Sequence, residues 1–469
     1  MDNESFRYWS HQAADWAADY RASIGERPVR AQMTPGAIGK LIEATPPEAP
    51  QSMESIFADF ERIVPDGMTH WQHPRFFAYF QSNAAPAAVI AEQLAGVMAA
   101  QCMLWQTSPA ATELEIKMVD WLRQSVGLPD EFKGVLQDTA SSATLCAVLT
   151  MRERALGWSG NQQGLAGKPA VRIYASTRTH TSVDKALWIA GIGQDNLVKI
   201  PTDENFAMRV DALRAAIAAD RENGLLPAGV VVCVGGTSIG ATDNVQAVCE
   251  TAREAGLYSH VDAAWASSAM ICPEFRRLWR GVELADSIVI NPHKWLGASM
   301  ECSAHFVREP QTLVKTLAIQ PEYLKTHGKD GLVNFSEWSV QLGRRFRALK
   351  VWFLLRAYGL QGLRARIRNH VAWSEQLAAR LASETDFEIV TAPILSLFSF
   401  RYTPSNHDTD LDALNLKLIN AINDDGRIYL TQTSHDGKLV VRFVAGQFDT
   451  QESDIDIAFT TICEVARAL

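Results

Sequence analysis

The segment INPHKWLG, residues 290–297, places His293 and Lys294 side by side between an apolar run and a tryptophan. Burying a lysine is costly, so this amine is either a solvated surface charge or a group that does chemistry. The segment HVDAAWA (260–266) places Asp262 at the end of another apolar run, where a partly desolvated carboxylate needs a cationic partner. Both side chains follow apolar runs, so the arrangement of these runs in the fold determines whether Asp262 and Lys294 lie close together.

Five short β-branched runs, separated by helical segments, are expected to position these side chains. They are VRIYAS (171–176), GVVVCVGG (229–236), LYSHVDAA (257–264), DSIVIN (286–291) and CSAHFVR (302–308). Because the runs lack polar alternation and are spaced by helices, they predict a largely parallel sheet covered on both faces. Ligands of such sheets collect at the carboxyl ends of the strands, where Asp262 and Lys294 are expected.

A hydroxyl-rich turn precedes the apolar-periodic helix in QDTASSATLCAVLTMRERA (137–155). Unpaired N–H groups at a helix start, with the hydroxyls of Thr139, Ser141 and Ser142 nearby, form a natural seat for a phosphate, although such residues also cap helices everywhere. His180 follows a predicted strand by four residues. It is expected either to reach the same crevice or to act as a helix cap.

The turn GGTSIGATDN (235–244) lacks the Gly-Lys-Ser/Thr ending of a P-loop, and the chain has no GxGxxG fingerprint, so nucleotide enzymes are disfavoured. Thr237 either contacts a phosphate or belongs to a plain turn. Jointly, the helix start, Asp262 for a ring nitrogen and Lys294 for an aldehyde describe a site for pyridoxal phosphate. The acid would keep the ring cationic, and a lysine beside that ring would be a nucleophile.

Composition narrows the class of protein. The chain has 469 residues, of which 47% are hydrophobic and 21% charged, as in globular proteins of more than one domain. A net charge of −9, without a basic block interleaved with aromatics, argues against nucleic-acid partners and favours small molecules. Seven scattered cysteines without a CxxC pair argue against disulfides and a zinc site. With no apolar signal region and no uninterrupted apolar span, we expect a cytoplasmic protein without a membrane segment or metal.

Five side chains near the N-terminus recur at helical spacing and predict an apolar stripe, which packs on the protein's own core or on a second subunit. They are Phe6, Trp9, Ala13, Trp16 and Tyr20. We expect an N-terminal helical arm over residues 1–85, a large cofactor-binding domain over 86–350 and a smaller C-terminal domain over 351–469.

Over nearly its whole length the sequence resembles the aromatic-L-amino-acid decarboxylase family, the group II pyridoxal-phosphate-dependent decarboxylases of fold type I. The resemblance rests on HPRFFAYF (73–80), SPAATELE (108–115), THTSVDKA (179–186), NFAMRVDAL (205–213), HVDAAWA, NPHKW, YLK (323–325) and LGRRFRALKVWF (342–353). It implies an α/β fold, a mainly parallel sheet sandwiched by helices, with an N-terminal helical arm and a small C-terminal α+β domain. It also implies a homodimer with active sites at the interface.

The resemblance assigns roles to individual residues. Lys294 matches the lysine that forms a Schiff base with the cofactor, and Asp262 matches the partner of the ring nitrogen. His180 matches the imidazole stacked on the ring, and Ala264 a contact on the other face. Tyr323 matches the tyrosine that protonates the substrate carbon after carbon dioxide leaves. The other implied cofactor contacts, chiefly to the phosphate, are Ala140, Ser141, Thr237, Asn291 and His293.

The implied substrate pocket departs from that of animal members. Its positions here are Tyr79, Phe80, Gln81, Ser82, Gln101, Met103 and Gly343. Gln81 and Ser82 replace Pro-Thr, and Gln101 and Met103 replace an isoleucine and a phenylalanine of the neighbouring subunit, so we expect a more polar, less aromatic pocket. Gly343 suits aromatic substrates better than the serine typical of histidine decarboxylases.

The implied reaction converts dopa, tyrosine, tryptophan or phenylalanine to the amine and carbon dioxide. Alternatives are an aldehyde synthase on the same scaffold, a decarboxylase of a non-aromatic amino acid, and a non-catalytic binding protein. Relatives that form aldehydes commonly depart at the position of His180 or Tyr323, and both residues are present. Transamination is disfavoured because no arginine motif for an α-carboxylate is evident, and glutamate because no further cation would receive its distal carboxylate.

Overall fold

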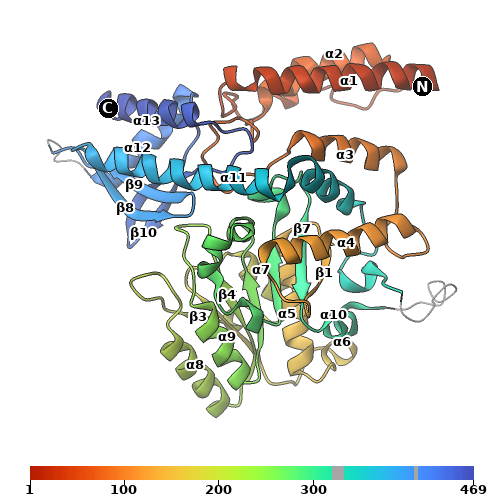
Figure 1. Cartoon of the computed structure of the whole chain (residues 1–469), viewed down its shortest axis with the longest axis vertical. Helices are drawn as coiled ribbons and strands as arrows, with labels where there is room; N and C mark the ends of the chain where they lie inside the picture. The colour runs from red at the N-terminus through yellow and green to blue at the C-terminus, as the bar shows by residue number, and fades with distance from the viewer. Residues whose placement is uncertain (320–331, 406–409) are drawn as a thin grey trace. The chain divides into compact units, whose positions relative to one another are not determined.

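The computed structural model of the protein describes residues 1–319, 332–405 and 410–469 (Figure 1). The chain forms two compact units. One comprises Met1–Gln81 together with Trp373–Leu469, and the other comprises Ser82–Ala372. The division into an arm, a large domain and a small domain stays a prediction.

The unit Ser82–Ala372 contains a seven-stranded sheet with the order β1-β7-β6-β5-β4-β2-β3. Its strands are β1 (Lys133–Gln137), β2 (Val171–Ser176), β3 (Leu197–Ile200), β4 (Leu226–Cys233), β5 (Tyr258–Asp262), β6 (Ser287–Ile290) and β7 (Ser303–Val307). Neighbours from β3 to β6 pair in parallel, whereas β7 is antiparallel to both β6 and β1. The predicted, mainly parallel sheet is confirmed, and each of the five predicted runs forms a strand.

Helices cover both faces of this sheet, which explains why its strands lack polar alternation. The covering helices are α5 (Ala140–Ala155), α7 (Ser182–Ile189), α8 (Val210–Glu222) and α9 (Val245–Glu254). Ile173 belongs to a buried cluster with residues of α5 and α7. The next residue, Tyr174, points to the opposite face and donates a hydrogen bond from its hydroxyl to Asp220 of α8 at 2.7 Å.

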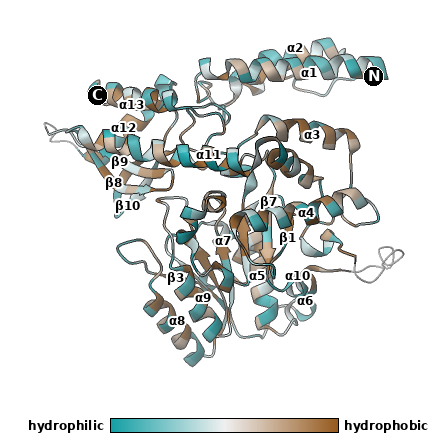
Figure 2. Ribbon diagram, in the orientation of Figure 1, coloured by the Kyte–Doolittle hydropathy of each residue, from teal (hydrophilic) through white to brown (hydrophobic). Residues whose placement is uncertain are grey.

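The same unit contains further helices around the sheet. They are α3 (Pro86–Met98), α4 (Pro109–Val126), the short α6 (Gly160–Gln163), α10 (Pro310–Leu317) and the first part of α11 (Arg347–Ser383). Helix α3 is apolar along much of its length and appears largely brown in Figure 2. It nevertheless leaves a row of large apolar side chains exposed, namely Ile90, Leu94, Val97 and Met98.

The other unit contains a four-stranded antiparallel sheet with the order β10-β11-β9-β8. Its elements are α1 (Asn3–Ser23), α2 (Met53–Ile63), β8 (Phe387–Ile394), β9 (Leu397–Tyr402), α12 (Leu411–Asp425), β10 (Thr431–His435), β11 (Lys438–Val444) and α13 (Glu452–Arg467). A core that includes Phe77, Phe398 and Phe443 packs between this sheet and its helices. This arrangement confirms the expected C-terminal α+β structure.

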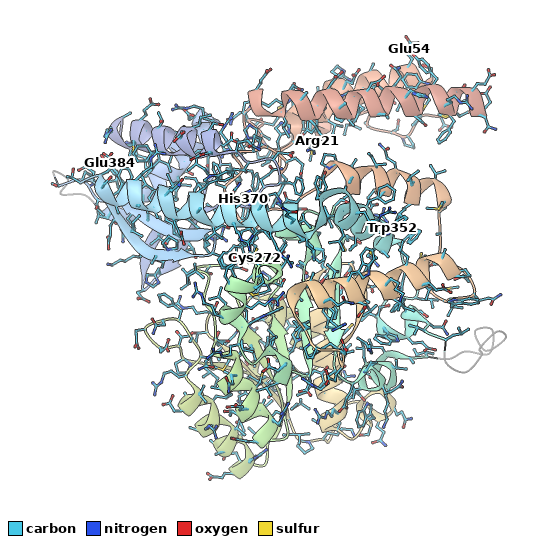
Figure 3. The ribbon with its side chains drawn as sticks, in the orientation of Figure 1. Arg21, Glu54, Cys272, Trp352, His370 and Glu384 are labelled. Carbon is cyan, nitrogen blue, oxygen red and sulfur yellow. The ribbon has the colours of Figure 1, made fainter. Side chains whose placement is uncertain are left out.

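Helix α1 carries the predicted aromatic stripe but contains no buried residue. Trp9 and Trp16 pack on Phe57 and Phe60 of α2, with ring centroids 5.4 and 4.7 Å apart, while Phe6 is 50% exposed. The stripe is therefore only partly covered within one chain. Near the end of the helix, Arg21, labelled in Figure 3, forms an ion pair with Asp449.

Candidate active site

The carboxyl ends of β2, β4, β5 and β6 lie along one edge of the large sheet, because these strands are parallel neighbours. Asp262 is the last residue of β5, His180 follows β2 and Lys294 follows β6. The structure brings these three side chains together, since the charges of Asp262 and Lys294 both affect the pKa of the His180 imidazole. This edge of the sheet therefore carries an acid, an amine and an imidazole.

Asp262 is half-buried at its strand end, and its Oδ1 accepts a hydrogen bond from the backbone N–H of Ala264 at 3.1 Å. The carbonyl of Ala264 in turn accepts from the N–H of Asn291, also at 3.1 Å. These bonds join the end of β5 to the residue that follows β6. They fix the carboxylate relative to the segment that contains Lys294.

Lys294 lies in a tight helical turn, Pro292–Leu296, with φ −86° and ψ −120°, values outside the helical region. Its carbonyl accepts a hydrogen bond from the side chain of Asn83 at 2.8 Å, and the Asn83 N–H donates to the carbonyl of His293 at 2.9 Å. The following residue, Trp295, stacks on Trp265 with ring centroids 5.1 Å apart. The backbone around the amine is thus held from several sides.

His180 is accessible to solvent at the edge of the sheet although the surrounding protein partly desolvates its ring. Desolvation lowers the pKa of the imidazole below its ordinary value, and Lys294 acts in the same direction, while Asp262 opposes both. Its Nδ1 accepts a hydrogen bond from the N–H of Ser182 at 3.1 Å. The neutral ring therefore carries its proton on Nε2, which is available as a donor.

His293 is buried, and burial together with Lys294 lowers the pKa of its imidazole to about 3. Its Nδ1 accepts a hydrogen bond from the N–H of Cys302 at 3.0 Å. The ring is therefore neutral, and Nε2 is again the protonated nitrogen. Asn291, also buried, has its side-chain oxygen bound by the Ser303 hydroxyl at 2.7 Å, which leaves the amide N–H groups to donate.

The first turn of α5 contains Ala140 and Ser141, and no side chain caps this helix start. The N–H groups of such a turn have no partner within the helix and attract an anion. Thr237 lies half-buried in the turn after β4, at the same edge of the sheet. The structure thus places the predicted phosphate contacts after the carboxyl ends of their strands.

Three positions predicted for the substrate pocket, Tyr79, Phe80 and Gln81, belong to the unit with the small sheet, and Ser82 begins the other unit. Gln81 is 2% exposed, and its amide donates to the carbonyls of Phe76 and Val444. Both amide protons are therefore used within that unit. Phe80 packs beneath the Arg442 guanidinium, and the exposed Tyr79 has a left-handed φ of 51°.

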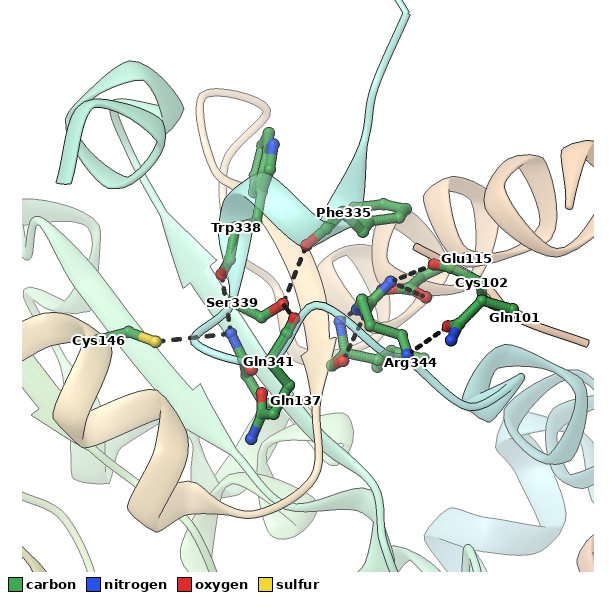
Figure 4. Close-up of polar contacts among 11 residues, drawn as sticks. Gln101, Cys102, Glu115, Gln137, Cys146, Phe335, Trp338, Ser339, Gln341 and Arg344 are labelled. Atoms are coloured by element: carbon green, nitrogen blue, oxygen red, sulfur yellow. Dashed lines mark hydrogen bonds and ion pairs between the residues drawn. The ribbon is translucent and has the colours of Figure 1, made fainter. Parts of the chain in front are cut away.

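The other predicted pocket positions, Gln101, Met103 and Gly343, belong to the unit Ser82–Ala372, and Figure 4 shows Gln101 beside Arg344. The side-chain oxygen of Gln101 accepts a hydrogen bond from the N–H of Arg344 at 2.7 Å, beside Gly343. The carbonyl of Met103 accepts from the N–H of Ser336 at 3.0 Å. Tyr323 lies outside the described residues, so its role stays a prediction.

A buried ion pair supports this cluster. Arg344 binds Glu115 through both terminal nitrogens, at 2.6 and 3.2 Å, and both side chains are almost fully buried. Arg344 also donates to the carbonyl of Leu136 at 2.7 Å, and Glu115 accepts from the Leu136 N–H at 2.8 Å. One ion pair therefore joins α4, strand β1 and the segment that contains Gly343.

The sequence did not predict the residues that fix the backbone of the turn containing Lys294. Asn83 binds the Lys294 carbonyl from 211 positions away, and Arg366 and His370 approach the same turn from α11. These side chains donate to backbone carbonyls or pair with a neighbouring ring, which leaves no local spacing to detect.

The residues at this edge fit pyridoxal phosphate. Asp262 suits a protonated ring nitrogen, Lys294 suits an aldehyde, and the uncapped start of α5 with the neutral His293 Nε2–H suits a phosphate. In the parts of the chain that the structure describes, no group of three or more His, Cys, Asp or Glu could hold a metal. A mainly parallel sheet with these groups at its carboxyl edge defines a pyridoxal-phosphate-dependent enzyme of fold type I.

Comparisons with known proteins narrow this class. Residues 35–403 match the family described as "Pyridoxal-dependent decarboxylase conserved domain". Tryptophan decarboxylase 2 of Oryza sativa subsp. japonica is 37% identical over 99% of this chain and 95% of its own, and phenylacetaldehyde synthase of Arabidopsis thaliana is 36% identical over 100% and 97%. Oryza sativa TDC, crystallised with PLP and tryptamine, superposes with a TM-score of 0.96 at 34% identity, covering 100% of this chain and 99% of that one. The chain belongs to the pyridoxal-dependent decarboxylase family.

Proposed function

We propose that this protein decarboxylates an aromatic L-amino acid to the corresponding amine and carbon dioxide. The observation that carries the proposal is the convergence of His180, Asp262 and Lys294 at the carboxyl edge of the sheet. The similarity to tryptophan and tyrosine decarboxylases, 37% over nearly the whole chain, supports an aromatic substrate. Catharanthus roseus tryptophan decarboxylase, solved with L-tryptophan, has a TM-score of 0.94 to this chain.

Each residue has a chemical task in this reaction. Bound pyridoxal phosphate supplies an aldehyde and a ring that accepts the electrons released when the bond from Cα to the carboxylate breaks. Lys294 provides the amine that binds the aldehyde and yields it to the substrate amine. Asp262 keeps the proton on the ring nitrogen, and the N–H groups of Ala140, Ser141 and the ring of His293 hold the phosphate.

Delivery of a proton to the substrate carbon after carbon dioxide leaves decides between amine and aldehyde. With the cofactor bound, the neutral His180 ring would lie against it, and the Nε2–H would be available to donate a hydrogen bond to the substrate. Tyr323, in the part of the chain outside the described residues, donates its hydroxyl proton to the substrate carbon after carbon dioxide departs, which yields the amine. Because this chain has both residues, we propose amine formation rather than the aldehyde chemistry named for Rhodiola rosea 4-hydroxyphenylacetaldehyde synthase, whose TM-score to this chain is 0.93.

We also propose that two copies assemble into a homodimer. The row Ile90, Leu94, Val97 and Met98 on α3 recurs on one side of the helix and is exposed in the single chain, Val97 to 70%. Such a row is typical of a subunit interface.

The location of the protein is a separate proposal. Among the described residues no helix is long and apolar enough to cross a membrane. Because all seven cysteines are buried and free, we propose a reducing, cytoplasmic location.

The direct test is to incubate the purified holoenzyme with a panel of L-amino acids, including histidine and glutamate, and to follow carbon dioxide, amine, aldehyde and peroxide together. Amine equal to carbon dioxide from an aromatic substrate is the expected result. Aldehyde with peroxide would instead establish an aldehyde synthase, and turnover of a non-aromatic acid alone would refute the proposed substrate class.

Two variants, each with a matched control, complete the test. Lys294→Ala should lose the visible absorbance of lysine-bound cofactor and all turnover, whereas Lys417→Ala, an exposed lysine of α12, should keep both. Val97→Asp should convert the dimer to a monomer in light scattering, whereas Leu416→Asp, at an exposed position of α12, should not. A lysine-bound cofactor in Lys294→Ala, or a dimeric Val97→Asp, would contradict the respective assignment.

A further inference from the structure

A cavity of about 550 Å³ lies beside β1, an edge strand of the large sheet, and none of its lining residues is among the predicted catalytic, cofactor-binding or substrate-pocket positions. β1 is antiparallel to β7 and β7 is antiparallel to β6, so β1 runs parallel to β6. Gln137, at the end of β1, therefore lies toward the catalytic edge. The cavity instead touches Lys133 and Gly134, at the start of this strand, together with α4 and the start of α10.

Four aromatic side chains line this cavity: Phe132, Phe306, Phe335 and Trp338. Phe335 and Trp338 lie on one short helical turn with ring centroids 5.9 Å apart in an edge-to-face arrangement, and both are labelled in Figure 4. A cavity of this volume with mostly apolar walls has the dimensions of a small-molecule site. Aromatic walls favour a flat aromatic ligand, because ring faces and edges attract one another.

The charges at the cavity favour an anion. Among the described residues that line it, Asp120 is the one carboxylate, and it already accepts hydrogen bonds from Arg123 and Gln124 at 2.9 and 2.8 Å. Two lysines line the same cavity. Lys117 is exposed on α4. Lys133 donates one hydrogen bond to a backbone carbonyl at 2.9 Å, and this neutral acceptor does not cancel the charge of the lysine. The charge available to a ligand is therefore positive.

The backbone of β1 adds a donor to this cavity. Leu136 directs its N–H and carbonyl away from β7, since Glu115 and Arg344 bind them. In an antiparallel pair the backbone groups of alternate residues point to the same edge, so Gly134 directs its N–H to the same outer side. An N–H of this kind binds a carboxylate well.

We propose that this cavity binds a flat aromatic carboxylate, with its ring against Trp338, the most exposed of the four aromatic side chains at 9%, and its carboxylate near Lys117 and the Gly134 N–H. The Phe335 ring also packs beneath the Arg344 guanidinium, 5.0 Å away. The Trp338 carbonyl accepts a hydrogen bond from the Gln137 side chain at 2.9 Å. A ligand on Trp338 therefore contacts the residue that binds the end of β1 and that packs on Phe335, the neighbour of Arg344.

The experiment is isothermal titration calorimetry of the holoenzyme with indole-3-acetate, an aromatic carboxylate that serves as the probe. We expect one site per chain. Lys117→Glu, which reverses the charge, and Ile116→Trp, which fills the cavity from α4, should each weaken binding by about tenfold or more. The matched control Lys417→Glu reverses an exposed charge on α12, outside this cavity, and should leave the affinity unchanged.

Competition distinguishes this cavity from the catalytic edge. Excess tryptamine, which has the same ring but no carboxylate, should leave binding of the probe unchanged. The proposal is refuted if the probe does not bind at millimolar concentration, if both cavity variants bind it as the wild type does, or if tryptamine displaces it. None of these outcomes depends on whether the enzyme decarboxylates an aromatic amino acid.

Discussion

The guanidinium of Arg366 donates a hydrogen bond to the backbone carbonyl of Trp295 at 2.8 Å, and Trp295 is the residue that follows Lys294. A second bond of the same length reaches the next carbonyl along the chain. One helical turn further along α11, His370 accepts a hydrogen bond from Trp295 Nε1 at 2.9 Å. The turn that carries the reactive lysine is therefore fixed by a helix that contributes no reacting group itself.

Replacing Arg366 with methionine should lower kcat by about tenfold, since hydrogen bonds from a charged donor contribute roughly 1.5–3 kcal/mol. KM should change less, because the residue acts on the lysine turn and not on the substrate. Reduced visible absorbance of lysine-bound cofactor would report the displaced turn, and Arg366→Lys should restore part of it. Arg368→Met, which removes an exposed partner of Glu274, is the control; an equal effect there would contradict a positioning role.

A serine at Gly343 should alter substrate selection through Gln101. A Cβ at this glycine would lie 3.3 Å from the side-chain nitrogen of Gln101, so the amide would have to shift by a few tenths of an ångström. Because both positions are predicted to line the substrate pocket, Gly343→Ser should change kcat/KM for aromatic substrates by roughly three- to tenfold. The double variant with Gln101→Ala should lose most of this effect. If the serine acts equally in both backgrounds, the contact is not its cause.

Breaking the ion pair between Arg344 and Glu115 should destabilise the fold strongly. Arg344→Met leaves a buried carboxylate without its partner, which costs about 3–5 kcal/mol. Urea denaturation of the holoenzyme measures this loss. The control Arg214→Met breaks an exposed ion pair with Glu254 and should cost no more than about 0.5–1 kcal/mol. Equal losses in the two variants would show that burial of the pair does not matter.

Acid should destabilise the protein through buried histidines. Burial lowers the pKa of His305 to about 4, below its ordinary value of 6.5, so the unfolded chain binds this proton more readily than the folded chain. Stability contributed by the neutral ring is complete above pH 6.5 and is lost as the pH falls toward 4, by about 1.4 kcal/mol per pH unit. His305→Phe should reduce the slope of unfolding free energy against pH by that amount. His11→Phe, at an exposed position of α1, should leave the slope unchanged.

The sequence predicted the interior of the large sheet better than its edges. The runs that became β2, β4, β5, β6 and β7 are apolar without alternation, which is the signature of strands buried on both faces. β1 (KGVLQ) and β3 (LVKI) are short, and pairing with a neighbouring strand decides their structure. The reversed direction of β7 depends on the path between strands, which no local pattern encodes.

At the candidate site, the sequence predicted the reacting groups but not the groups that support them. Lys294 and Asp262 each follow an apolar run directly, so topology alone brings them to one edge. Asn83 and Arg366 reach the lysine turn through single bonds to backbone carbonyls, and such contacts depend on the folded path. Gln81 was predicted to line the substrate pocket, and its side-chain amide donates hydrogen bonds to two backbone carbonyls of its own unit.

The unit with the small sheet is assembled from both ends of the chain, Met1–Gln81 and Trp373–Leu469, while Ser82–Ala372 forms the other unit without interruption. During synthesis the first 81 residues leave the ribosome long before their partner segment exists. The uninterrupted unit, by contrast, has all of its strands once residue 307 is made. Its sheet is therefore free to form first, and residues 1–81 complete their core only once residues 373–469 have been made.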